Sequence, residues 1–240
     1  MADETNARDE DVAHGVVDED FPQDAEDGEE ESSPAFIPLP LPQLTDDPQT
    51  LPDCCLSLSR PLLRELHGRL PPAPQLTLSI GSGTGLLEGL LHDLASSSSS
   101  STPPYGDATA TLNLVSVEVA PSPNRYHAAH RTVPGTWALD PLAAEARAWV
   151  FVYPKQVALV RGYVAEFVSG AGGRGCAVET VVYVGPRRDW DDFRAAFDGL
   201  MASFEVWDED RMEAVGGRAW ECVAIVRPEK NGGGGSVPGK

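Results

Sequence analysis

The sequence lacks the features that mark several large classes of protein. No stretch approaches the roughly 18 consecutive apolar residues of a membrane-spanning helix, and the acidic N-terminus has neither the basic nor the apolar region of a secretory signal. Lys and Arg form no run, so we do not expect nucleic acid to be a partner. The four cysteines form no CxxC pair and have no paired histidines nearby, which predicts reduced thiols and no metal site. Together these absences predict a cytoplasmic or nuclear protein that does not associate with a membrane.

Acidic charge is concentrated at the N-terminus. Residues 1–50 contain sixteen Asp or Glu and a single basic residue, Arg8, whereas the other 190 residues contain 21 acidic and 17 basic residues. Few large apolar residues precede Phe36, so this segment cannot bury enough surface to offset its ordering entropy. We therefore predict an acidic disordered tail and Pro-rich lead-in at 1–50, a folded domain at 51–229 and a Gly-rich tail at 230–240. The acidic tail suits a basic protein partner.

Strand and helix patterns alternate through the folded domain. Strands are predicted at 76–80, 112–119, 131–139, 148–154, 177–186, 204–207 and 220–226, and helices at 59–70, 86–94, 123–130, 140–147, 157–167 and 189–201. Such alternation predicts an α/β fold, a three-layer Rossmann-like arrangement with a mostly parallel seven-stranded sheet. Only about a dozen residues separate the last two strands, which favours an antiparallel hairpin and therefore a reversed last strand.

A glycine-rich loop joins the strand at 76–80 to the helix at 86–94. Gly81, Gly83 and Gly85 form a GxGxG pattern, which is typical of a backbone that a ligand approaches closely. A dinucleotide fingerprint would need its third glycine where Leu86 stands, and the loop lacks the lysine of a phosphate-binding P-loop. The pattern therefore indicates a ligand loop of another kind.

The segment LSIGSGTGLLEGLL resembles the first motif of class I S-adenosylmethionine-dependent methyltransferases, a family with seven strands and a closing hairpin. The resemblance extends over roughly residues 57–227. It implies S-adenosyl-L-methionine as cofactor, with its amino-acid moiety above Gly81, Ser82, Gly83 and Gly85.

The family also has an acidic residue at the end of the second strand, which binds the ribose hydroxyls. Glu118 stands at this place, and its two oxygens can accept both hydroxyl donors. Gly85 and Glu118 are 33 residues apart, whereas a compact unit of this kind has about 20. Ser96–Ala108 is a low-complexity insertion of thirteen residues, and its removal leaves 20.

Further positions follow from the resemblance. Trp137 and Ala138 fall where family members place residues near the adenine, and Tyr153 falls at the end of the fourth strand, where many carry catalytic or substrate-contacting groups. Tyr153 is therefore a weak catalytic candidate. The chain departs from the family at Ser79, because many members have an acid there that orients the methionine ammonium group. It also lacks the Asn-Pro-Pro-Tyr signature of members that modify amino groups or nucleobases.

These observations predict an S-adenosylmethionine-dependent methyltransferase that acts on a small molecule or a protein side chain. Positioning supplies much of the acceleration in such a displacement, so a dedicated catalytic residue need not exist. The alternative is a non-catalytic protein of the same fold that serves as a cofactor-binding or scaffold module, which Ser79 and the undistinguished fourth-strand motif favour.

Overall fold

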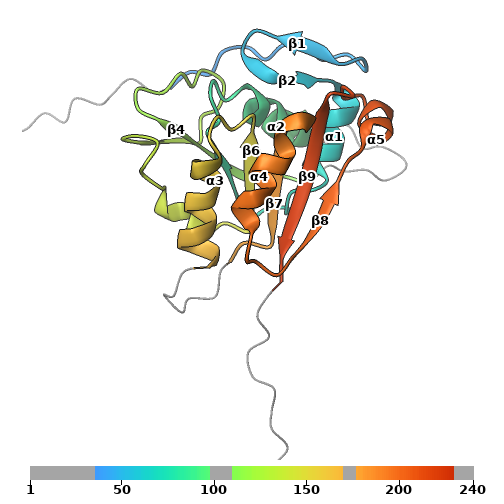
Figure 1. The fold of residues 1–240 in the computed structure, drawn as a ribbon. Coiled ribbons are helices and arrows are strands. Elements are labelled where there is room, and N and C mark those ends of the chain that lie inside the picture. Colours follow the sequence, from blue (N-terminus) through green and yellow to red (C-terminus); the bar gives the residue numbers. More distant parts are fainter. Residues whose placement is uncertain (1–35, 98–109, 170–176, 230–240) are drawn as a thin grey trace, which may run out of the picture. The chain divides into compact units, whose positions relative to one another are not determined.

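The computed structural model of the chain describes residues 36–97, 110–169 and 177–229 (Figure 1). The predicted acidic tail, the serine-rich insertion beyond Ser97 and the Gly-rich tail lie outside the described residues. Within the described ranges, no helix is both long enough and apolar enough to cross a bilayer.

A seven-stranded sheet organises the domain, with strand order β5-β4-β3-β6-β7-β9-β8. Its strands are β3 (Leu76–Ile80), β4 (Asn113–Val119), β5 (His130–Val133), β6 (Ala148–Val152), β7 (Thr180–Pro186), β8 (Ala202–Val206) and β9 (Glu221–Pro228). The strands from β5 to β7 pair in parallel, whereas β9 runs antiparallel to both β7 and β8. The predicted α/β fold with a mostly parallel sheet and a reversed last strand is confirmed.

Helices cover both faces of the sheet (Figure 1). They are α1 (Arg60–His67), α2 (Leu86–Ser97) and α5 (Glu209–Ala214) on one face, and α3 (Val157–Tyr163) and α4 (Trp190–Arg194) on the other. Neighbouring residues of β6 serve different cores: Val150 packs with the α1 and α2 side, and Trp149 and Phe151 with the α3 side. Because both faces are covered, β6 and β7 are apolar at successive positions, and the polar residues Thr77 and Ser79 of β3 are buried as well.

Helix α1 begins as the sequence predicts. The Ser59 hydroxyl accepts a hydrogen bond from the Leu62 amide at 3.2 Å, and Pro61 occupies the first turn, where a missing N–H costs nothing. Its apolar face buries Leu62 and Leu66 against α2 and the sheet.

The helix predicted over Pro123–His130 is wrong, because residues 123–129 form a loop and His130 begins β5. The Ser122 hydroxyl accepts from the Asn124 amide at 3.1 Å, and the Asn124 side chain donates to the His127 carbonyl at 2.9 Å. Such local bonds between side chains and backbone compete with a helix.

The helix predicted from Asp140 to Arg147 is shorter, a 3₁₀ turn over Pro141–Ala144. Asp140 does cap it, accepting from the Leu142 amide at 2.9 Å. The Arg147 amide instead donates to the Leu76 carbonyl of β3 at 2.8 Å, so the chain is already paired with the sheet at this residue.

A small hairpin was not predicted. β1 (Gln49–Leu51) and β2 (Cys54–Leu58) form a separate antiparallel two-stranded sheet in a region whose prolines indicated only an extended lead-in. Leu56 and Leu58 are fully buried in the core beside α1, so this hairpin is fixed to the domain.

Candidate functional site

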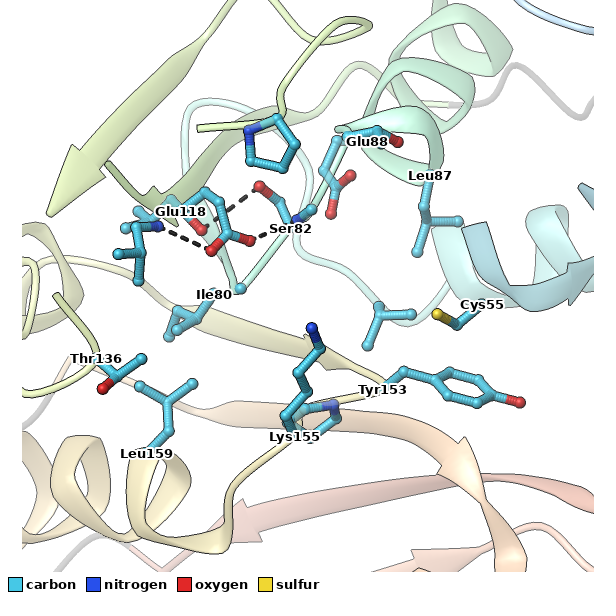
Figure 2. Close-up of a pocket in the computed structure, with 18 of the residues that line it drawn as sticks. Cys55, Ile80, Ser82, Leu87, Glu88, Glu118, Thr136, Tyr153, Lys155 and Leu159 are labelled. Carbon is cyan, nitrogen blue, oxygen red and sulfur yellow. Dashed lines mark hydrogen bonds between the residues drawn. The ribbon is translucent and has the colours of Figure 1, made fainter. Parts of the chain in front are cut away.

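A pocket of about 530 Å³ lies at the carboxyl ends of β3, β4 and β6 (Figure 2). Strand β3 lies between β4 and β6, so successive connections leave it in opposite directions. This is the point at which open parallel sheets bind their ligands, and the volume suits a small organic ligand.

The glycine loop forms one wall of this pocket. The Gly81 amide donates to the Val117 carbonyl at 2.9 Å, which fixes the loop to the end of β4. Gly81 and Gly83 line the pocket with φ of 74° and 59°, and a Cβ built on either would meet no atom within 4 Å. No described residue fills the space that these glycines leave, and a ligand can approach the backbone there.

Gly85 has another role. It does not line the pocket, and a Cβ there would lie 2.2 Å from Asn124 Oδ1 and 3.1 Å from the His127 Cβ. This third glycine lets the 120–129 loop pack against the start of α2.

We expect Gly85→Ala to cost more stability than Gly81→Ala. Both positions have left-handed backbone, φ 77° and 74°, so each alanine costs about 1–2 kcal/mol. At Gly85 the collision with Asn124 adds about 1–3 kcal/mol of overpacking. Urea unfolding of the two variants measures the difference; equal losses would show that Asn124 moves aside freely.

Glu118 lies at the end of β4, facing the glycine loop (Figure 2). Its Oε2 accepts from the Gly83 amide at 2.7 Å, and its Oε1 accepts from the Val119 amide at 2.8 Å. Each oxygen keeps a further lone pair for a ligand hydroxyl. The backbone therefore holds this carboxylate in one orientation at the pocket wall.

Asp53, in the turn of the β1–β2 hairpin, holds a second wall of the pocket in place. Its carboxylate accepts from Arg125 Nη2 at 2.5 Å and from the Tyr126 hydroxyl at 2.8 Å, and its carbonyl accepts from the Thr84 hydroxyl at 2.7 Å. These bonds join the hairpin to the glycine loop and to the 120–129 loop. Cys55, the next residue but one, lines the pocket as a result.

Tyr153 follows β6 with φ of 48°, the only non-glycine residue with positive φ among those described. Its hydroxyl donates to Glu221 Oε1 at 2.7 Å, and the same oxygen accepts from the Ser57 amide at 3.0 Å. Burial and the Glu221 carboxylate raise the pKa of Tyr153 well above its usual range. The phenol therefore stays protonated and is unsuited to act as a base, although its oxygen can still accept a hydrogen bond.

Of the two residues predicted to lie near the adenine, only one lines the pocket. Ala138 lines the pocket, whereas Trp137 does not; its side chain is 79 % exposed and its ring covers Gly135. Ser82 lines the pocket beside Gly81 and Gly83. The predicted set thus comes together except for Gly85 and Trp137.

Sequence reasoning missed Glu88, which also lines the pocket. It lies in the first turn of α2 between Leu87 and Leu90, is only 2 % exposed, and accepts from the Ser79 hydroxyl at 2.5 Å. A single acid on the apolar side of a helix was the available signal, since a carboxylate is rarely buried without a partner.

The sheet decides the fold assignment. Seven strands close with an antiparallel pair, a glycine loop follows the central strand β3, and an acid ends its neighbour β4. The chain has the class I methyltransferase fold.

No protein-family model and no curated protein matches the chain in sequence. Solved structures that are similar to it include the 23S rRNA methyltransferase ErmE, at 15% identity over 72% of this chain and 69% of that one, with a TM-score of 0.42. Others are a predicted O-methyltransferase, Atu636 from Agrobacterium tumefaciens (9% identity, 70% and 81% covered, TM-score 0.43), and a dimethyladenosine transferase from Plasmodium falciparum (8%, 72% and 62%, TM-score 0.43).

The prediction that nucleic acid is not a partner is wrong as an exclusion. A 23S rRNA methyltransferase and a small RNA methyltransferase are among the structures similar to this methyltransferase-fold chain. The lack of a Lys or Arg run argues only against non-specific phosphate binding, and a protein of this fold need not bind its acceptor in that way.

Proposed function

We propose that the chain is an S-adenosyl-L-methionine-dependent methyltransferase that acts on a small molecule or a protein side chain. The observation that carries this proposal is the Glu118 carboxylate, fixed by the Gly83 amide beside a glycine loop that leaves open space in front of it. A carboxylate with free lone pairs suits the two hydroxyls of a ribose.

The residues of the pocket fit this cofactor. Glu118 would hold the ribose, Gly81, Ser82 and Gly83 would support the amino-acid moiety, and Ala138 would lie near the adenine. When bound, the cofactor supplies a methyl group on a sulfonium. In the transfer of that group, the protein's main contribution is to position the two reactants.

The acceptor would lie toward Tyr153 and the hairpin. Tyr153 keeps its proton on a bond to Glu221, so its oxygen can accept a donor group of the acceptor and orient it. Cys55 and Pro52 complete this side of the pocket. We therefore assign Tyr153 to positioning and not to proton removal.

Calorimetry with S-adenosylmethionine and S-adenosylhomocysteine tests the cofactor, and we expect binding of both at submillimolar concentration. Transfer of a labelled methyl group to small-molecule, protein and RNA fractions then tests the reaction and the acceptor class. Absence of binding by the folded chain would refute the proposal. Binding without transfer to any fraction would favour the non-catalytic alternative, and transfer to RNA alone would overturn the proposed acceptor.

A further inference from the structure

Glu88 has an unusual environment for a carboxylate. It is 2 % exposed, its Oε1 is bonded to the Ser79 hydroxyl at 2.5 Å, and its Oε2 is buried with no hydrogen-bond partner among the residues that the structure describes. Buried polar atoms are nearly always satisfied, and an unpaired buried charge costs several kcal/mol or more. An orphaned oxygen of this kind calls for a partner that the described residues do not supply.

No cation of the described chain forms an ion pair with Glu88. The groups that face it are the Ser79 hydroxyl from β3, the Glu118 carboxylate from β4 and the Cys54 thiol from β2. Burial, with a smaller contribution from Glu118, raises the pKa of Glu88 to about 7, although the Ser79 bond opposes the shift. A positive charge beside Glu88 would offset both the cost of burying the carboxylate and its repulsion by Glu118.

The pocket is where such a charge can arrive. Glu88 lines the cavity together with Gly81 and Ser82, and Figure 2 shows its side chain on the same side of the cavity as Ser82 and Glu118. A ligand that bonds to Glu118 through hydroxyls therefore has a second carboxylate within the same cavity. Ser79 is buried and does not line the cavity, and its hydroxyl donates to the Glu88 carboxylate.

We propose that Glu88 binds the primary ammonium group of the pocket's ligand, with Ser79 as its positioning residue. The inference rests on the proposed function, because the ammonium group in question is that of the cofactor's amino-acid moiety. In this chain the acid that neutralises the ammonium comes from helix α2, nine residues after Ser79, and not from the strand.

The test compares two ligands that share adenosine and a thioether sulfur. S-adenosylhomocysteine carries the amino-acid moiety, and 5′-methylthioadenosine does not. We expect Glu88→Gln to weaken binding of S-adenosylhomocysteine about 10- to 150-fold, the effect of a lost charged hydrogen bond, and to change binding of 5′-methylthioadenosine less than twofold. Glu145→Gln, at an exposed site outside the pocket, is the matched control and should change neither.

Equal loss of both ligands in Glu88→Gln would show a structural role and overturn the inference, as would unchanged affinity for both. If the wild-type chain binds 5′-methylthioadenosine and S-adenosylhomocysteine equally well, the inference fails and the proposed function stands. If it binds neither, the proposed function fails as well.

A second measurement needs no variant. Between pH 5.5 and 7.5 the ligand amine stays protonated while Glu88 ionises, so the affinity of the wild-type chain for S-adenosylhomocysteine should rise with pH. The affinity for 5′-methylthioadenosine should change much less. Because both ligands carry the ribose, any effect of Glu118 is common to the two pH profiles and cancels when they are compared. Parallel pH profiles for the two ligands would contradict an ionic contact at Glu88.

Discussion

Replacing Glu118 with alanine is expected to weaken binding of S-adenosylhomocysteine and of 5′-methylthioadenosine alike, by about 1–3 kcal/mol or roughly 5- to 150-fold, because both ligands carry the ribose. The variant also frees the Gly83 amide, which now donates to Glu118 Oε2 at 2.7 Å. Calorimetry of both ligands against the variant measures the effect.

The paired loss distinguishes Glu118 from Glu88, whose replacement should affect one ligand only. Glu145→Ala provides the control for the loss of an acidic side chain outside the pocket. Unchanged affinity in Glu118→Ala would refute the ribose assignment while leaving the fold intact.

Trp149→Ala is expected to cause the largest loss of stability, about 3–5 kcal/mol in the free energy of unfolding. The Trp149 side chain is fully buried, its ring meets Tyr163 and Phe167 edge-on at centroid distances of 5.8 and 6.2 Å, and its Nε1 donates to the Ala143 carbonyl at 3.1 Å. Truncation leaves a cavity between β6 and α3 and an unpaired carbonyl.

Urea unfolding followed by circular dichroism measures this loss. Trp137→Ala is the control, because the Trp137 side chain is 79 % exposed and its removal should cost less than about 1 kcal/mol. Similar losses in the two variants would mean that the α3 side of the core readily collapses around the missing ring.

The inner strands of the sheet were predictable because they are short, mostly apolar segments bounded by turn residues, whereas β5 (His130–Val133) is polar and shorter than the predicted strand. β3, β4, β6 and β7 lie where these runs indicated, and the dozen residues before the last strand correctly indicated its reversal. The serine-rich insertion could be recognised by its composition alone. Once it is left out, the spacing between the glycine loop and Glu118 matches that expected for a compact unit of the family.

The failures have different causes: local bonds between side chains and backbone, contact between segments far apart in the chain, and a buried polar group on an apolar helix face. Residues 123–130 have no helix because Asn124 bonds to its own neighbours and packs against Gly85. The Tyr153–Glu221 pair joins residues 68 positions apart, and no local pattern announces it. Glu88 was hidden in a run of leucines, since periodicity reports which face is apolar and not which polar group that face conceals.

The β1–β2 hairpin has a consequence for how this protein can change. It forms a sheet of its own, and Asp53 fixes its turn to the loops around the pocket. The proposed acceptor side of the pocket thus includes the turn of a short ribbon that forms no strand pairing with the seven-stranded sheet, although Leu56 and Leu58 anchor the ribbon in the core. If the proposed function holds, substitutions in that turn would alter the choice of substrate while the proposed ribose and ammonium contacts stay in place, so a new specificity could evolve without rebuilding the scaffold.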